Sequence, residues 1–301
     1  MKHIPVLLNE TIDALQLKPG SNVIDCTLGD GGHTAKMLKH TAPNGLVLGI
    51  DADPESLARA KQFLYDDANR MIFVRENFEH LAKIVADEKF SPVNGILMDL
   101  GWSSPQFEER KRGFSFQNSD EPLDMRYTPN SEMKTAAELL QDNTEEKLEH
   151  IFRTYGEERL SKEIAHAIKA YEQSINNTSD LVNIVLDVYR KKLKTDKEVP
   201  WVGGLHPATK VFQALRIAVN DEFGVIERAL PQAIDVLEKG GRLAVITFHS
   251  GEDRIVKHYF KSEQNKTIQI ITKKPIVASE SEAKENTRAR SAKLRVVEKI
   301  T

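Results

Sequence analysis

The segment that most constrains the fold is NVIDCTLGDGGHT at residues 22–34. Its apolar start, from Val23 to Cys26, suits a buried strand, and the glycines from Gly29 to Gly32 permit a sharp turn with exposed backbone. A helix that starts behind such a turn offers unpaired N–H groups to a polar or anionic ligand. The segment therefore predicts a ligand-binding strand, turn and helix, although an ordinary strand-to-helix connection has the same pattern.

The spacing of the glycines indicates which ligand to expect. The dinucleotide-binding pattern requires a third glycine three residues after Gly31, where this chain has Thr34, so the spacing argues against NAD. The arrangement acidic-x-x-x-Gly-x-Gly, which begins at Asp25, instead resembles the first motif of S-adenosylmethionine-dependent methyltransferases. S-adenosylmethionine is therefore the expected cofactor.

Composition and charge exclude several classes of protein. The chain has 301 residues, enough for one large domain or two modest ones, and no apolar run is long enough to span a bilayer. Asn9 and Glu10 interrupt the apolar run at the start, which is unlike a signal peptide, so a cytoplasmic location is expected. A net charge of −3 gives no overall attraction to nucleic acid, so such a partner must bind a local basic patch.

The cysteine and histidine content limits redox and metal chemistry. The single cysteine, Cys26, excludes an internal disulfide and a cysteine-built zinc site, and its apolar surroundings predict a small buried residue. No second histidine stands at ligand spacing from His249, so no metal is expected.

Strand and helix patterns alternate in two parts of the chain. Strands are expected at residues 23–26, 46–50, 71–74, 95–100 and 243–248, with helices between them. This alternation predicts an α/β fold with a parallel sheet covered on both faces, in a discontinuous domain of residues 1–104 and 206–301. Residues 105–205 contain helical runs and no convincing strand, which predicts an inserted helical domain.

The end of the chain has a different pattern. Residues 267–272 and 293–299 alternate apolar and polar side chains, as in an antiparallel pair of strands. The polar residues 279–290 between them are expected to form a mobile loop.

Three aspartates stand at the ends of predicted strands. Ligands of open parallel sheets bind beyond the carboxyl ends of the strands, so Asp25, Asp51 and Asp99 are expected to line one crevice. Asp51 stands where nucleotide-binding sheets place a carboxylate against ribose hydroxyls. Asp53 precedes Pro54 and is instead expected to cap a helix.

The segment DLGWSSPQF at residues 99–107 has a pattern suited to amine chemistry. It loosely resembles the (Asp/Asn/Ser)-Pro-Pro-aromatic motif of methyltransferases that act on the amines of adenine or cytosine. Such an amine is a poor nucleophile, so a site must accept an N–H hydrogen bond and hold the nitrogen in line with the methyl group. Asp99, Ser103 and Ser104 are the candidates for this positioning. Two interpretations of Trp102 and Phe107 stay open, namely stacking on the base and packing between domains.

An ordered set of segments resembles one family over nearly the whole chain. The segments are HIPVL at 3–7, GDGGHT at 29–34, DLGWSSPQ at 99–106, RGFSF at 112–116, PLDMR at 122–126, TYGEER at 154–159, HPAT at 206–209, FQALR at 212–216, FHS at 248–250 and NTRARS at 286–291. Together they resemble the bacterial ribosomal small-subunit RNA cytosine-N4 methyltransferases, the RsmH or MraW family. The resemblance implies a Rossmann-like methyltransferase fold and N4-methylation of a cytidine in the decoding region of 16S rRNA with S-adenosylmethionine.

The resemblance also implies roles for single residues. The cofactor contacts of the family fall on Gly31, Gly32, His33, Asp51, Phe78, Asp99 and Gln106. The chain departs from the family at Trp102, where a small aliphatic residue is usual, and at Gly251, where an apolar residue is common. Trp102 is close in sequence to the expected cofactor contacts, so this departure leaves the shape of the cofactor pocket open.

Local clusters of basic and aromatic residues are candidates for RNA binding, because cations neutralise phosphates and aromatic rings stack bases. The candidates are Arg110, Lys111, Arg112, Phe114, Phe116, Arg126, His249, Arg288 and Arg290. The basic run at residues 190–197 is a further candidate, although a solvated helix face has the same composition. The inserted domain is the expected site of substrate recognition.

Partners and alternative functions stay open at this point. The expected partner is 16S rRNA within the small ribosomal subunit, with no membrane partner, and the oligomeric state is open, with a homodimer as one option. The alternatives are a methyltransferase of the same fold that acts on another nucleic acid or a protein, and a non-catalytic ribosome assembly factor.

Overall fold

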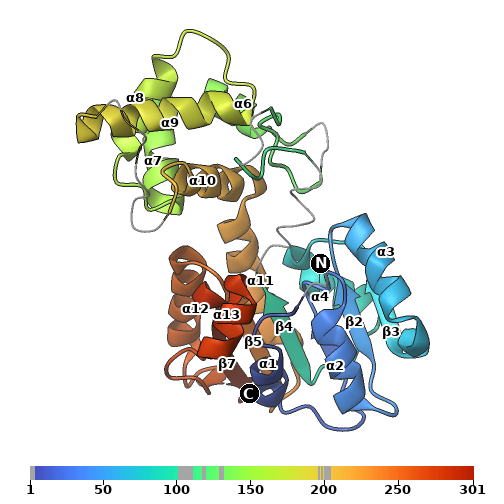
Figure 1. Ribbon diagram of the computed structural model, residues 1–301. Helices are drawn as coiled ribbons and strands as arrows, with labels where there is room; N and C mark the ends of the chain where they lie inside the picture. The colour runs from blue at the N-terminus through green and yellow to red at the C-terminus, as the bar shows by residue number, and fades with distance from the viewer. Residues whose placement is uncertain are drawn as a thin grey trace. The chain divides into compact units, whose positions relative to one another are not determined.

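The computed structural model describes residues 4–100, 111–116, 120–128, 132–195, 197, 199 and 205–301, and the chain divides into two compact units (Figure 1). The α/β unit contains Met1–Trp102 and Phe223–Thr301, and the helical unit contains Ser103–Glu222. Within the described residues, no helix has the length and apolarity needed to cross a bilayer.

The α/β unit is built on a seven-stranded sheet in the order β3-β2-β1-β4-β5-β7-β6. The strands are β1 (Val23–Asp25), β2 (Val47–Ile50), β3 (Met71–Val74), β4 (Gly95–Asp99), β5 (Arg242–Thr247), β6 (Ile268–Ile270) and β7 (Lys293–Lys299). The first five strands are parallel, and β7 runs antiparallel to both of its neighbours. This arrangement confirms the predicted parallel sheet and the closing antiparallel pair.

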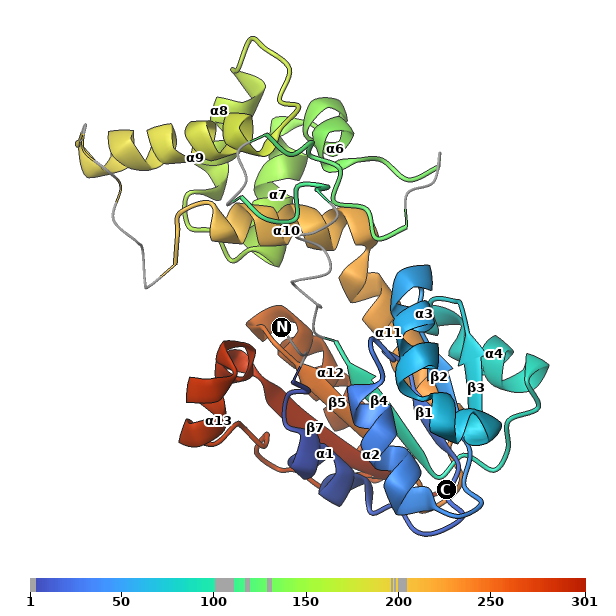
Figure 2. The same ribbon diagram turned by 45° about the vertical axis from the view of Figure 1, so that its right-hand side comes forward.

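Helices cover both faces of this sheet, because successive residues of a strand point to opposite sides (Figure 2). On β4, Ile96 and Met98 pack with α4, α11 and α12, whereas Leu97 packs with α1, α2 and α3. These helices are α1 (Leu8–Leu15), α2 (Gly32–Thr41), α3 (Pro54–Phe63), α4 (Leu81–Asp87), α11 (Glu222–Val236) and α12 (Ser250–Glu263), and the short helices η1 (Tyr65–Arg70) and η2 (Phe78–His80) flank β3. The predicted Rossmann-like α/β fold is confirmed.

The helical unit encloses a core of its own. Its helices are α6 (Ala136–Asp142), α7 (Glu145–Tyr155), α8 (Ser161–Lys169), α9 (Thr178–Leu193) and α10 (Thr209–Asn220). Leu148, Phe152, Ile164 and Leu181 are fully buried in this core. The side chains of Thr135, Thr144 and Asn177 cap α6, α7 and α9 by accepting hydrogen bonds from backbone N–H groups.

The second boundary between the units differs from the predicted one. The sequence places it before residue 206, but in the structure it follows Glu222. The reason is α10, whose Val211, Phe212 and Leu215 are buried in the core of the helical unit. An amphipathic helix shows which face is buried but not which core it packs against, so its sequence could not place this boundary.

The expectation of a mobile loop at residues 279–290 is wrong. This stretch forms α13 (Glu280–Glu285), which Ser279 caps, and leads into the short helix η3 (Thr287–Ser291). Glu282 Oε1 accepts a hydrogen bond from Leu7 N–H (2.7 Å), and the Asn286 side-chain amide donates to Ile4 O (3.0 Å). The polar residues thus hold the N-terminal segment, a long-range contact that composition alone does not reveal.

Candidate active site

The candidate site lies where β1, β2 and β4 end, because these strands are parallel neighbours in the sheet. Asp51, directly after β2, accepts hydrogen bonds from the N–H groups of Gly29 (2.8 Å) and Asp53 (2.8 Å). Asp53 caps α3 by accepting from Glu55 and Ser56 N–H groups, as predicted. The Asp51 carboxylate is therefore fixed against the glycine turn that follows β1.

Asp25 forms hydrogen bonds with residues on either side of the glycine turn. Its carboxylate is 1% exposed, accepts a hydrogen bond from the Thr34 hydroxyl (2.7 Å) and a longer one from Thr27 N–H (3.2 Å). Burial raises the pKa of Asp25, although the two hydrogen bonds, and His33 when it is protonated, oppose this shift. The neighbouring Cys26 is buried, as predicted, and burial raises the pKa of its thiol. Asp51 and Asp99 are the more exposed of the three strand-end aspartates.

Asp99, at the end of β4, lies beside His33 of α2. Asp99 Oδ2 is 3.8 Å from His33 Nδ1, and Asp99 N–H donates to the Thr27 hydroxyl oxygen (2.8 Å). His33 Nε2 lies 3.1 Å from Val6 O. Because a carbonyl oxygen only accepts, Nε2 carries the proton of a neutral ring and Nδ1 presents its lone pair toward Asp99. Two acceptors therefore face one another at the end of β4, which suits a ligand that donates N–H.

The buried His33 gives a testable dependence of stability on pH. Burial lowers the pKa of His33, so the folded α/β unit keeps the ring neutral while the unfolded chain takes up a proton near pH 6.5. Stability is therefore expected to fall as the pH drops below about 6.5, by at most about 1.4 kcal/mol per pH unit. Urea unfolding between pH 7.5 and 5.5 should show a smaller fall for His33→Gln, whose amide can still donate to Val6 O. Equal slopes for the two proteins would contradict this account.

The glycine turn leaves no room for larger side chains. Gly31 has a φ of +84°, which favours glycine, and it begins α2 as the N-cap. A Cβ on Gly32 would lie 2.4 Å from Cγ of Pro5. The turn therefore keeps its backbone bare where the N-terminal segment crosses it.

Arg288 lies in the α/β unit at the edge of this site. Its guanidinium carbon is 5.8 Å from the centre of the Phe248 ring, just past the end of β5. Burial lowers the pKa of Arg288, and the negative charge of Asp99 opposes that shift. The position beside Asp99 could not be predicted, because η3 is distant from β4 in the sequence and no local pattern links them.

The other predicted residues of the α/β unit have structural contacts. Phe78 begins η2 after β3, is half-buried and packs against the core. His249 caps α12 by accepting a hydrogen bond from Glu252 N–H, and its ring lies 5.7 Å from that of Phe223. A Cβ on Gly251 would lie 2.4 Å from the Phe223 ring, which explains glycine at this departure from the family. The helix α12 itself is not among the predicted elements.

Arg290 is the remaining RNA-binding candidate in this unit. It is exposed, and its Nε donates to Ala283 O (3.1 Å). Ser103, Ser104, Gln106 and Arg110, together with Trp102, lie outside the described residues.

The RNA-binding candidates of the helical unit are largely engaged in local contacts. Arg126 forms two hydrogen bonds with the Asp124 carboxylate (2.7 and 2.9 Å), and Arg112 donates to Arg126 O (2.8 Å). Phe114 stacks on Tyr127, and Phe116 stacks on His206, with ring centres 5.9 and 4.7 Å apart. Lys111 is exposed. These contacts shape the segment after residue 110, and its role in RNA binding stays a prediction.

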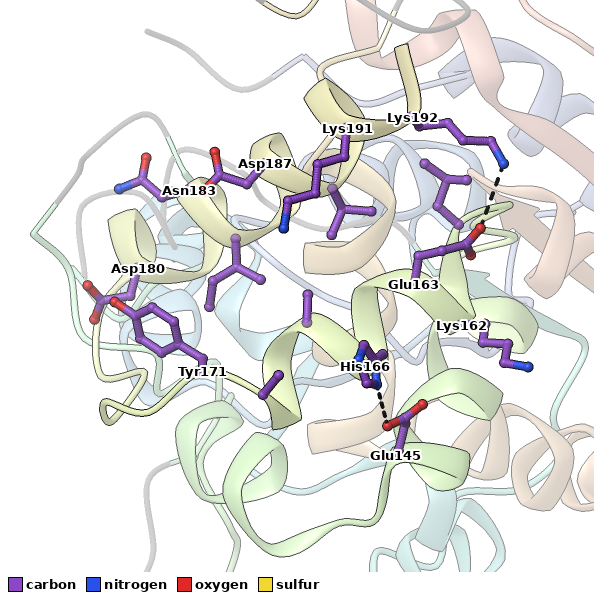
Figure 3. Close-up of a pocket in the computed structure, with 15 residues that line it drawn as sticks. Glu145, Lys162, Glu163, His166, Tyr171, Asp180, Asn183, Asp187, Lys191 and Lys192 are labelled. Atoms are coloured by element: carbon purple, nitrogen blue, oxygen red, sulfur yellow. Dashed lines mark hydrogen bonds and ion pairs between the residues drawn. The ribbon is translucent and has the colours of Figure 1, made fainter. Parts of the chain in front are cut away.

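A hollow of about 1130 Å³ opens between α8 and α9 of the helical unit (Figure 3). Its lining includes apolar side chains such as Ile184 and Val188, a contact between His166 and Glu145 (3.0 Å) and an ion pair of Lys192 with Glu163 (3.8 Å). Arg190, in the basic run of α9, pairs with Asp187 (2.6 Å). These pairs favour the solvated-face interpretation of the basic run over an RNA-binding one.

The fold and the site together define a doubly wound α/β protein whose glycine turn and strand-end carboxylates meet at one edge of the sheet. The chain belongs to the MraW methylase family, whose model matches residues 1–300. It is therefore a methyltransferase, as predicted.

Two relatives of similar sequence agree with this assignment. The chain is 43% identical to the ribosomal RNA small subunit methyltransferase H of Heliobacterium mobile, over 99% of each chain. It is 42% identical to the protein of that name in Carboxydothermus hydrogenoformans, over 99% of this chain and 98% of the relative. A solved rRNA methylase from Streptococcus thermophilus shares 13% identity with a TM-score of 0.45, covering 100% of this chain and 99% of its own.

Proposed function

We propose that this enzyme methylates N4 of a cytidine in the decoding region of 16S rRNA, with S-adenosylmethionine as the methyl donor. The observation that carries the proposal is the position of Asp99, an acceptor fixed at the end of β4 beside the glycine turn of a methylase. The ribosomal RNA methyltransferases to which the chain is similar support this class of substrate.

The residues of the crevice fit S-adenosylmethionine. Asp51, held against the glycine turn by its hydrogen bond from Gly29 N–H, can accept hydrogen bonds from ribose hydroxyls. Phe78, His33 and Gln106 are proposed as further contacts. When bound, the cofactor supplies an electrophilic methyl group on a sulfonium centre.

The chain's own residues position the acceptor amine. The N4 lone pair of cytosine is delocalised into the ring, so a hydrogen bond from N4–H to the Asp99 carboxylate would hold the nitrogen and increase its electron density. Ser103 and Ser104 are proposed to assist. The nitrogen loses one N–H proton after it gains the methyl group, and water or a nearby oxygen can accept that proton.

The finer assignments extend this proposal. We place the reaction in the cytoplasm, with the small ribosomal subunit as the form in which the RNA is recognised. The helical unit is proposed to recognise the substrate, and a homodimer is one option for the oligomeric state.

Methyl transfer to small ribosomal subunits tests the proposal. Subunits from cells that lack this gene would be incubated with the enzyme and labelled S-adenosylmethionine, with naked rRNA in parallel, followed by nucleoside analysis. Label in N4-methylcytidine at one decoding-region position is expected. Label in another nucleoside would indicate a different target, and no label despite cofactor binding would favour an assembly factor.

Removal of the Asp51 carboxylate is expected to weaken cofactor binding. Asp51→Ala loses the acceptor for Gly29 N–H as well as the proposed ribose contact, and hydrogen bonds to a charged group contribute about 1.5–3 kcal/mol. The affinity for S-adenosylhomocysteine should therefore fall at least about tenfold by calorimetry. Asp66→Ala, at an exposed site in η1, serves as the control and should bind normally. An unchanged affinity of Asp51→Ala would remove this residue from the site.

A further inference from the structure

Glu158, a residue with a buried side chain, is among those that line a small cavity within the helical unit. The cavity has a volume of about 310 Å³, and its lining includes Glu158, Arg159, Tyr189, His206 and Lys210. Glu158 is 3% exposed, although a charged side chain is rarely buried this fully without partners.

The carboxyl group of Glu158 is only half satisfied. Its Oε1 accepts hydrogen bonds from the Tyr189 hydroxyl (2.9 Å) and from Leu160 N–H (2.9 Å). Burial, followed by the hydrogen bond to Glu158, raises the pKa of Tyr189, which keeps this donor protonated. Among the described residues, Glu158 Oε2 has no hydrogen-bond partner. A buried acceptor without a hydrogen bond destabilises the folded state. The unpartnered Oε2 of Glu158, whose Oε1 is fixed by two hydrogen bonds, therefore indicates a ligand that donates hydrogen bonds to it.

Charges and rings at the cavity narrow the class of ligand. Arg159 is exposed and Lys210 is half-buried, so two cations favour a ligand that also carries an anionic group. The His206 ring stacks on the Phe116 ring, with the ring centres 4.7 Å apart. This contact fixes the orientation of His206, whose ring offers a flat surface for stacking. Burial lowers the pKa of His206, so this ring is neutral at neutral pH. A planar base with N–H donors and a phosphate meets all three requirements.

Guanine is the base whose edge best matches an acceptor-only carboxylate. Its N1–H and N2–H donors are adjacent, whereas adenine and cytosine each place an amine donor beside a ring acceptor. Uracil places its single N–H between two acceptors. In each of these three bases an acceptor atom would lie against a Glu158 oxygen, and two acceptors cannot form a hydrogen bond with each other.

We propose that this cavity binds a guanine nucleotide of the RNA substrate, with the guanine N1–H and N2–H donating to Glu158 and the phosphate beside Arg159 and Lys210. The inference deepens the proposed function and rests on it, because it assigns one RNA contact of the helical unit.

Nucleotide binding by the full-length protein tests the inference. Guanosine monophosphate is titrated by calorimetry or NMR, with S-adenosylhomocysteine present at saturation so that the other crevice is occupied. Inosine monophosphate, which lacks the N2 amine, should bind several-fold more weakly, and the adenosine and cytidine monophosphates weaker still. Glu158→Gln replaces one acceptor oxygen by a donor and should weaken guanosine monophosphate binding about tenfold or more.

Matched variants separate the parts of the site. Glu172→Gln removes the same charge at an exposed position of this unit and should bind like the wild type. Arg159→Gln should weaken guanosine monophosphate but leave guanosine unchanged, because only the phosphate contact is lost. Thermal unfolding of Glu158→Gln shows whether the unit stays folded, and Arg159→Gln provides a second test if it does not.

The outcomes distinguish this inference from the proposed function. No binding of guanosine monophosphate, equal binding by Glu158→Gln, or a preference for another base would each overturn the inference. Methyl transfer to subunits is measured independently, so the cavity can fail while N4-methylation stands. Binding of guanosine monophosphate without methyl transfer would instead sink the proposed function.

Discussion

Asp99→Asn is expected to lower kcat/KM for methyl transfer by about 100-fold or more. The asparagine keeps the size of the side chain, and its backbone N–H can still donate to the Thr27 hydroxyl oxygen. The amide, however, replaces one acceptor oxygen with a donor and removes the negative charge, so the acceptor amine would be held poorly. Loss of one preorganised polar contact at a reacting centre costs about 10²–10³ in rate. Single-turnover transfer to small subunits, with saturating cofactor, measures this loss.

Two comparisons isolate the role of the Asp99 carboxylate. Asp66→Asn makes the same chemical change at an exposed position and should leave the rate unchanged. The affinity of Asp99→Asn for S-adenosylhomocysteine, measured separately, shows how much of the loss reflects cofactor binding. If Asp99→Asn kept more than about half of the wild-type rate, Asp99 would not position the amine.

The sheet could be predicted because its signals are local. Apolar runs bounded by glycine, proline or aspartate mark β1, β2, β4 and β5, and their alternation with helices implies parallel pairing. The placement of α10 could not be predicted in this way, since its apolar face would fit either core. The fold class therefore followed from local pattern, but the domain boundary depended on tertiary packing.

In the candidate site, too, local features could be predicted from the sequence, whereas contacts between distant segments could not. Asp53 caps α3, as its place before a proline indicated, whereas the ligand contact expected of Asp51 from its place at a strand end stays a prediction. The proximity of His33 to Asp99 and the position of Arg288 depend on segments distant in sequence, so no spacing revealed them. The same limit applies to Glu158, whose burial and unsatisfied oxygen are properties of packing.

Asp253→Ala is expected to destabilise the α/β unit by about 3–5 kcal/mol, because it removes one partner of a buried ion pair. Asp253 of α12 accepts hydrogen bonds from Nε (2.7 Å) and Nη2 (3.2 Å) of Arg295 on β7, and both side chains are nearly buried. Burial alone would raise the pKa of Asp253, but Arg295 and Lys293 outweigh this effect and lower it. The pair therefore stabilises the unit above about pH 3.8, and this contribution is lost as the pH falls through the lowered pKa of the folded state.

Native-state hydrogen exchange of the β5 and β7 amides measures this loss within the α/β unit, and protection should fall by about 10²-fold or more. Asp87→Ala breaks the exposed pair with Lys83 (2.9 Å) and should leave this protection almost unchanged, because water screens the pair. The double variant Asp253→Leu with Arg295→Met removes both charges and should recover most of the lost stability, because no unpaired cation stays buried. If the double variant were as unstable as Asp253→Ala, packing rather than the unpaired charge of Arg295 would be the cause.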